Sequence, residues 1–150
     1  MLRFKQAANL IIFDDKSGVF VHIYYIKSEK TAWMWEKCAK KREFTEQEKN
    51  IISQIGKKYN VDFNLDGKFT YDAIGCSECN NSGYYERTGI FEVLNVEDNI
   101  KELIENGASS IEIREQALKR GYKPLIVDGI NKVIEGITTL GEIDKKIIIN

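Results

Sequence analysis

Two runs rich in β-branched and aromatic residues lie near the N-terminus, from Asn9 to Phe13 and from Val19 to Ile26. The polar residues 14–18 separate them. Two apolar runs joined by a short polar turn are typical of a β-hairpin. The pattern therefore predicts a hairpin, and His22, the only histidine, is expected to be an ordinary strand residue rather than a catalytic or metal-binding one.

Further along, the apolar positions change to the spacing of a helix. Thr45 and Glu48 form a capping box, in which the side chain of each can bond the backbone N–H of the other. The helix that they open is expected to end near Lys58, with Ile51, Ile52 and Ile55 on its apolar face. In the segment 61–71 the pair Asp66-Gly67 predicts a second, shorter hairpin.

The residues after Leu94 predict four short helices: 98–106, one capped by Ser109 and ending at Gly121, 125–135, and one capped by Thr139. Helices of about ten residues are marginal in water, so these must pack on other elements. We expect them to form one unit on a strand from Ile90 to Leu94. Six apolar residues should then be buried: Ile100, Leu103, Ile113, Leu118, Val133 and Ile143.

The expected fold is therefore α+β, in three parts. An N-terminal hairpin segment spans residues 1–34, a small cysteine-containing subdomain spans 35–94, and a helical C-terminal subdomain of about four short helices spans 95–150. The aromatic cluster Trp33-Met34-Trp35 is expected to be a hydrophobic plug beneath the cysteines, and a docking surface is the alternative.

The composition narrows the class of protein. The 150 residues are 43% hydrophobic and 30% charged, as expected for a soluble globular chain. A net charge of −1 argues against nucleic acid or an anionic membrane as the main partner. No apolar run approaches the roughly 20 residues that span a bilayer, and the N-terminus does not resemble a signal peptide. Three cysteines, an odd number, favour free or metal-bound thiols in a reducing cytoplasm.

The strongest chemical signal is the C-x-x-C pair of Cys76 and Cys79, because a tight turn points both sulfurs the same way. Cys38 supplies a third sulfur, whereas Trp35 stands where a second C-x-x-C would begin. A thiolate site of this kind suits zinc. The fourth ligand could be His22, Glu36, Asp72 or water. The alternative is that the site binds no metal and consists of three small buried thiols.

A longer motif follows the cysteines. Ser82-Gly83-Tyr84, Arg87 and Gly89-Ile90-Phe91-Glu92-Val93-Leu94 match the signature T-G-Y-x-G-R-x-G-I-F-E-V-L. Downstream, Ile113-Arg114 with Ala117, Asp128-Gly129 with Lys132-Val133, and Thr138-Thr139-Leu140 match later motifs in the same order. From about Cys38 onward the chain resembles the C-terminal region of the ATPases that power bacterial type II secretion and type IV pilus assembly. It departs from that pattern at Trp35, Glu86 and Gly141.

This resemblance implies an ATPase parent, but no G-x-x-x-x-G-K-[ST] loop occurs in the sequence to hold nucleotide phosphates. The expected function is thus a truncated, non-catalytic module without bound nucleotide, serving subunit packing or docking. Its expected partners are secretion or pilus ATPase subunits or an inner-membrane platform protein. It should be cytoplasmic, reaching the inner membrane only through partners and not by insertion.

Two other functions are open. One is a stand-alone interaction or regulatory protein derived from the same module. The other is an enzyme with a low-pKa cysteine, which is disfavoured because the C-x-x-C pair follows Gly75 and does not open a helix. The resemblance also implies a role for Arg87, as an ion pair to a neighbouring subdomain or subunit. The simpler alternative is a salt bridge to Glu86 or Glu92, and Asp128 is expected to cap a helix.

Overall fold

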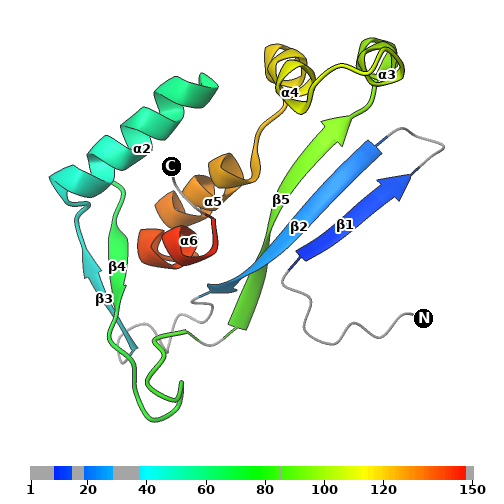
Figure 1. The fold of residues 1–150 in the computed structure, drawn as a ribbon. Coiled ribbons are helices and arrows are strands. Elements are labelled where there is room, and N and C mark those ends of the chain that lie inside the picture. The colour runs from blue at the N-terminus through cyan, green and yellow to red at the C-terminus, as the bar shows by residue number, and fades with distance from the viewer. Residues whose placement is uncertain (1–8, 15–18, 29–37, 85, 148–150) are drawn as a thin grey trace, which may run out of the picture. The chain divides into compact units, whose positions relative to one another are not determined.

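The computed structural model describes residues 9–14, 19–28, 38–84 and 86–147 and has the α+β fold expected from the sequence (Figure 1). The chain divides into two compact units. One comprises residues within 1–24 and 91–125, and the other comprises residues within 25–90 and 126–150. The aromatic cluster Trp33-Met34-Trp35 lies outside the described residues.

The predicted N-terminal hairpin is confirmed. Strands β1 (Asn9–Asp14) and β2 (Val19–Ser28) pair antiparallel, from Asn9 opposite Tyr24 to Asp14 opposite Val19. Strand β5 (Glu86–Asn95) completes a three-stranded sheet in the order β1-β2-β5 (Figure 1). The hairpin thus reaches the strand that follows the cysteine motif, about 60 residues later in the chain.

Helix α2 (Glu46–Tyr59) begins at the predicted capping box. The N–H of Glu48 donates to Thr45 Oγ1 over 3.3 Å, and the N–H of Thr45 donates to Glu48 Oε2 over 2.9 Å. The helix ends at Asn60, which adopts the left-handed conformation with a φ of 52°. Ile52 and Ile55 are buried, as predicted, whereas Ile51 is half-buried.

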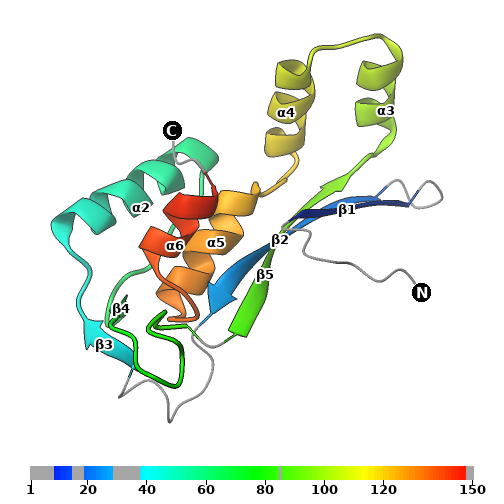
Figure 2. The same cartoon turned by 60° about the horizontal axis from the view of Figure 1, so that its bottom comes forward.

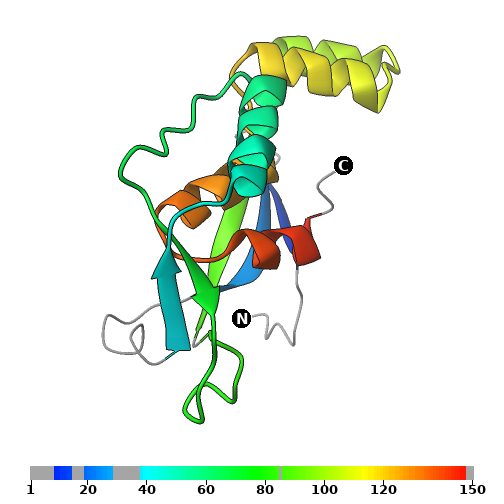
Figure 3. The same ribbon diagram turned by 90° about the vertical axis from the view of Figure 1, so that its left-hand side faces the viewer.

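The prediction of a hairpin within 61–71 is wrong, because no strand precedes the turn that Asp66 and Gly67 form in this segment. Strand β4 (Thr70–Ala73) pairs instead with β3 (Ala39–Arg42), which precedes α2 (Figure 3). The two ends of this pair are Ala39 opposite Ala73 and Arg42 opposite Thr70. The pairing therefore carries the chain back from α2 to the point where it left Cys38.

Arg42 ties this β-ribbon to the start of α2. Its guanidinium donates to both carboxylate oxygens of Glu48 over 2.7 and 2.9 Å, and to Asp72 Oδ1 over 2.8 Å. The hydrogen bonds from Arg42 outweigh partial burial and lower the pKa of Glu48 to about 2. A bidentate pair of this kind is stronger than a single surface ion pair.

The Arg42–Glu48 pair makes a pH-dependent contribution to stability. The folded pKa of Glu48 lies below its ordinary value of 4.5, so the contribution is complete above pH 4.5 and is lost as the pH falls toward 2. Glu48→Gln should lower the free energy of unfolding by about 1–2 kcal/mol at pH 7, after allowing for partial exposure. Urea unfolding of both proteins at pH 7, 4.5 and 3 measures this.

Glu46→Gln provides the control, because Glu46 is exposed and pairs only with Lys49 of the same helix among the contacts described for it. It should leave stability almost unchanged at each pH. If the free energies of unfolding of the parent and of Glu48→Gln differ by the same amount at pH 7 and at pH 3, the charge of Glu48 is not the origin of the effect.

Helices α3 (Asp98–Glu105) and α4 (Ser110–Lys119) form a helical hairpin in the first unit (Figure 2). The capping box predicted at Ser109 is present, with Glu112 N donating to Ser109 Oγ over 3.3 Å and Ser109 N donating to Glu112 Oε2 over 2.7 Å. Ile100 is buried as predicted, but the other three apolar residues predicted to be buried here are only half-buried: Leu103, Ile113 and Leu118.

Helices α5 (Leu125–Ile134) and α6 (Leu140–Lys146) belong, apart from Leu125, to the second unit. Val133 and Ile143 are fully buried there, as predicted. The four helices, which were expected to form one unit, are divided between the two: α3 and α4 belong to the unit with residues 1–24 and 91–125, and α5 and α6, apart from Leu125, to the unit with residues 25–90 and 126–150. None of the described helices is long and apolar enough to cross a membrane.

Candidate metal centre

The C-x-x-C pair lies in a tight loop between β4 and β5, and hydrogen bonds within the loop hold its backbone. The N–H of Asn81 donates to Cys76 O over 2.8 Å, and the N–H of Ser82 donates to Cys79 O over 3.1 Å. Asn80 and Asn81 both adopt positive φ angles, 52° and 57°, as their residue types allow. The loop thus closes on itself with both sulfurs on its inner side.

Cys38 joins this loop through the β-ribbon. The N–H groups of Ile74 and Gly75 both donate to the carbonyl of Cys38, over 2.8 and 3.1 Å. The pairing of β3 with β4 thereby places a cysteine 38 positions upstream beside Cys76. Cys38 and Cys79 are buried, whereas Cys76 is half-buried.

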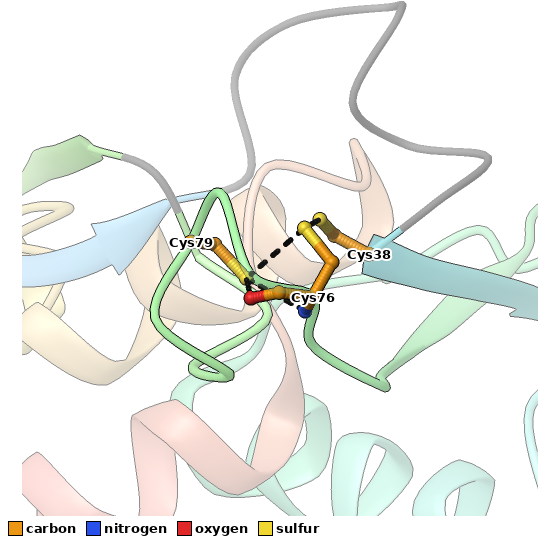
Figure 4. Close-up of side chains that lie close together, drawn as sticks. All are labelled: Cys38, Cys76 and Cys79. Atoms are coloured by element: carbon orange, nitrogen blue, oxygen red, sulfur yellow. Dashed lines mark hydrogen bonds between the residues drawn. The ribbon is translucent and has the colours of Figure 1, made fainter.

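The three sulfurs form a compact cluster (Figure 4). The Sγ atoms of Cys38 and Cys76 lie 2.7 Å apart, those of Cys76 and Cys79 lie 3.8 Å apart, and all three fall within 4.8 Å of one another. All three thiols are free. The structure therefore brings together every cysteine that the sequence proposed as a ligand, and three sulfurs in this arrangement can hold a metal ion.

The loop also prepares one of the sulfurs to carry negative charge. Burial raises the pKa of Cys79, but N–H donors from Cys76 at 3.1 Å and Gly83 at 3.3 Å outweigh it and lower the pKa to about 6. The hydrogen bond with Cys76, followed by burial, raises the pKa of Cys38 to about 12. The C-x-x-C pair therefore needs no helix N-terminus to lower the pKa of a thiol, because backbone groups of the loop, which residue types do not reveal, are the donors.

Of the three candidates for a fourth protein ligand, the structure describes the side chain of one, Asp72. Asp72 is exposed, its Oδ1 accepts a hydrogen bond from Arg42, and it is not part of the cysteine cluster. Glu36 lies outside the described residues, and so does the side chain of His22. Among the described residues, no histidine, aspartate or glutamate joins the three cysteines.

Gly83 is a residue of the site that the cysteine pattern alone does not indicate. Its φ is +75°, and a Cβ at this position would overlap the Cβ of Ala73 and lie 2.8 Å from the Cα of Ala73. Only glycine therefore lets the loop approach β4 this closely, and the N–H of the same residue donates to Cys79 Sγ. The glycine of the Ser82-Gly83-Tyr84 motif was the available signal in the sequence.

Gly83→Ala should lower the free energy of unfolding by about 1–3 kcal/mol through backbone strain, with steric overlap adding to it. Gly67→Ala is a matched control, because Gly67 also has a positive φ, +65°, but open space around its Cα. Thermal unfolding of the two variants separates strain from overlap. Equal losses in both would show that the contact with Ala73 is not limiting.

Two further residues, Arg87 and Asp128, were singled out by the family motifs. Arg87 is exposed on β5. One of its two expected partners, Glu92, accepts hydrogen bonds from Tyr122 Oη over 2.8 Å and from Leu125 N over 2.9 Å. Asp128 lies inside the first turn of α5, where its carboxylate pairs with Lys132 Nζ over 2.7 Å. It therefore sits too late in the helix to be its N-cap.

A contact between two other motif residues connects the loop to α6. The hydroxyl groups of Tyr84 and Thr139 form a hydrogen bond of 2.7 Å. Thr139 is also the N-cap of α6, since its Oγ1 accepts from Glu142 N over 3.2 Å. The sequence motifs around Gly83 and Leu140 thus meet within the second unit.

Comparison with known proteins agrees with these motifs. Residues 35–145 match the family Type II/IV secretion system protein. The chain is 42% identical over 78 residues to a type IV pilus assembly ATPase PilB of Myxococcus xanthus. The aligned residues make up 51% of this chain and 14% of that protein. It is 41% identical over 73 residues to the type II secretion system ATPase E of Vibrio cholerae, covering 49% and 14%.

A type IV pilus assembly ATPase TfpB of Acinetobacter baylyi is 36% identical over 73 residues, 49% of this chain and 12% of that protein. The matched parts therefore span only about one seventh of these relatives' length. The family match, in contrast, includes the three cysteines, the β3–β4 ribbon and helices α2 to α6. By this match the chain belongs to the family of type II/IV secretion system proteins.

Proposed function

We propose that this chain is a non-catalytic module of a secretion or pilus assembly ATPase that serves subunit packing or docking. The observation that carries the proposal is the family match over residues 35–145, which contains the cysteine cluster and five helices among the described residues. No G-x-x-x-x-G-K-[ST] loop occurs in the 150 residues to hold nucleotide phosphates, which supports a role other than hydrolysis.

Exposed apolar side chains in the first unit favour docking. Phe91 and Val93 lie on one face of β5 and are 44% and 47% exposed, whereas Ile90, on the opposite face, is fully buried. Ile104 and Ile111 of the α3–α4 hairpin are also exposed. Surfaces of this kind are typical of protein contacts, and the candidate partners are ATPase subunits or the inner-membrane platform protein.

We further propose that the cysteine cluster holds zinc as a structural ion. A tetrahedral ion with Zn–S bonds of about 2.3 Å separates its sulfurs by about 3.8 Å. Cys76 and Cys79 have this separation, and a small rotation of the Cys38 side chain would open its 2.7 Å contact with Cys76. The N–H donors to Cys79 Sγ are the outer-shell contacts that a thiolate ligand needs. Zinc would join β3 to the loop without taking part in a reaction.

Size-exclusion chromatography with a full-length family ATPase from the same organism tests the proposed docking. The chain should co-elute with the ATPase, and Val93→Asp should weaken co-elution while Lys101→Asp, at an exposed position of α3, should not. Failure of the parent chain to co-elute under any nucleotide condition would contradict a packing or docking role.

The purified chain should not hydrolyse ATP. Because the sequence contains no phosphate-binding loop motif, phosphate release should equal that of a heat-denatured sample. A malachite-green assay over a range of Mg²⁺-ATP concentrations measures this. Turnover that scales with the concentration of folded protein would exclude the non-catalytic assignment.

A further inference from the structure

The cysteine cluster offers a metal ion three protein sulfurs and no more. The chain contains only three cysteines, so a site with four thiolates cannot form within one copy. All three cysteines already belong to the cluster, and the described part of the chain adds no other histidine or carboxylate. Zinc in proteins is almost always four-coordinate, so one position of the ion is left without a ligand among these residues.

The two described carboxylates nearest in sequence to the cluster, Glu78 and Asp72, do not belong to it. Glu78 lies between Cys76 and Cys79 but is exposed. Asp72 precedes Cys76 by four residues, but its Oδ1 lies 2.8 Å from Arg42 Nε, and Arg42 also binds Glu48. Moving Asp72 to the sulfurs would break the charge-assisted bond that joins β4 to Arg42 on β3. Asp72 is therefore held by the β-ribbon and not by the metal centre.

The cluster is also not sealed on the side of the loop. Cys38 and Cys79 are 4% and 6% exposed, whereas Cys76 is half-buried and its neighbours Ser77 and Glu78 are exposed. Closed structural sites bury their ions behind four protein ligands, while sites that keep an open position hold a water molecule there. The exposure of this loop provides solvent with a path to the ion.

We propose that a zinc ion on Cys38, Cys76 and Cys79 takes its fourth ligand from solution, a water molecule that a low-molecular-weight thiol can replace. This inference rests on the proposed zinc site. In the exchange the thiol releases its proton to solvent, its sulfur bonds to zinc, and water leaves, with no change of oxidation state. Sulfur is a soft donor that suits a thiolate site, so the replacement should be favourable.

Zinc K-edge X-ray absorption on the zinc-loaded chain tests this directly. After zinc content has been measured as one ion per chain, we expect three sulfur neighbours and one light atom. Addition of 2-mercaptoethanol should raise the sulfur count to four, and ethylene glycol, its closest alcohol counterpart, should leave it at three. A native mass spectrum should show the gain of one bound thiol only in the first case.

Variants at the two candidate ligands outside the described residues test whether the protein itself supplies the fourth ligand. His22→Ala and Glu36→Gln should leave both zinc affinity and the response to thiol unchanged. If either variant lowers zinc affinity tenfold or more, the fourth ligand belongs to the protein and the inference is wrong. If the thiol never adds a fourth sulfur to the parent, the inference is also wrong, because the fourth position does not accept a thiol from solution.

Trp35→Cys is the positive control, because it adds a thiol at the position where the related motif has one. This variant should show four sulfur neighbours without added thiol and should no longer respond to 2-mercaptoethanol. A parent chain that binds no zinc at all contradicts the metal site itself, and the initial measurement of zinc content distinguishes that failure from a closed site. Neither result affects the docking test.

Discussion

A chelator should lower the melting temperature of the zinc-loaded protein by several degrees, and Cys76→Ser should reproduce most of this loss. An ion that binds only the folded state stabilises it by about 2.7 kcal/mol when free zinc exceeds the dissociation constant 100-fold. For a chain of this size each kcal/mol corresponds to roughly 2–4 °C. Calorimetry with and without a chelator measures the shift.

The expected loss of zinc affinity in Cys76→Ser is large. Removing an outer-shell partner of a metal ligand costs about 10–100-fold in affinity, so removing a ligand should cost at least as much. Ser77→Ala is the matched control, because Ser77 is exposed in the same loop and its neighbour Cys76 keeps its sulfur. A chelator that leaves the melting temperature unchanged would show that β3 and the loop are held together without metal.

Replacing Ile143 with alanine should have the second large effect, a loss of about 2–5 kcal/mol in the free energy of unfolding. Ile143 is fully buried on α6. A Cβ added at Gly129 of α5 would lie 3.1 Å from Ile143 Cδ1, so the two helices approach closely at this pair. Truncation of Ile143 therefore leaves a cavity against the backbone of α5. Urea unfolding measures the loss.

Two further variants identify the origin of this effect. Gly129→Ala should be more favourable in the Ile143→Ala background than in the parent, because the new methyl group occupies part of the cavity and no longer meets Ile143 Cδ1. Ile111→Ala, at a 68% exposed position, should change stability by less than about 0.5 kcal/mol. Additive effects of the Gly129 and Ile143 substitutions would show that these residues do not pack together.

Leu103 should respond less strongly to the same substitution than Ile143 does. Its spacing in the sequence is the same as that of a core residue, and the sequence predicts that it is buried. In the structure it is half-buried in a two-helix hairpin that has few buried residues of its own. An alanine substitution at Leu103 is therefore expected to cost less than one at Ile143.

Interactions between residues close in the chain could be predicted from the sequence. The capping boxes of Thr45 with Glu48 and of Ser109 with Glu112 each close over three residues, so residue types and spacing are sufficient to place them. The same holds for the β1–β2 hairpin and for the turn of Cys76 and Cys79, where the chain need only fold back on itself.

The tertiary structure alone decided which distant segments meet. A short polar turn at Asp66-Gly67 is compatible with a local hairpin, but β4 gains more by pairing with β3, since that pairing also brings Asp72 to Arg42. The division of four similar helices between two units likewise depends on long-range packing, because an apolar face does not specify its partner.

The cysteine cluster combines both kinds of information. Three cysteines and a C-x-x-C spacing name the candidate ligands, and the structure confirms that they meet. The lowered pKa of Cys79 depends on backbone N–H groups of Cys76 and Gly83, whose direction is set by positive φ angles and by contact with β4. The sequence by itself thus determined the ligand types and the local turns, whereas the fold decided how Cys38 reaches them, because hydrogen bonds between distant strands leave no local pattern.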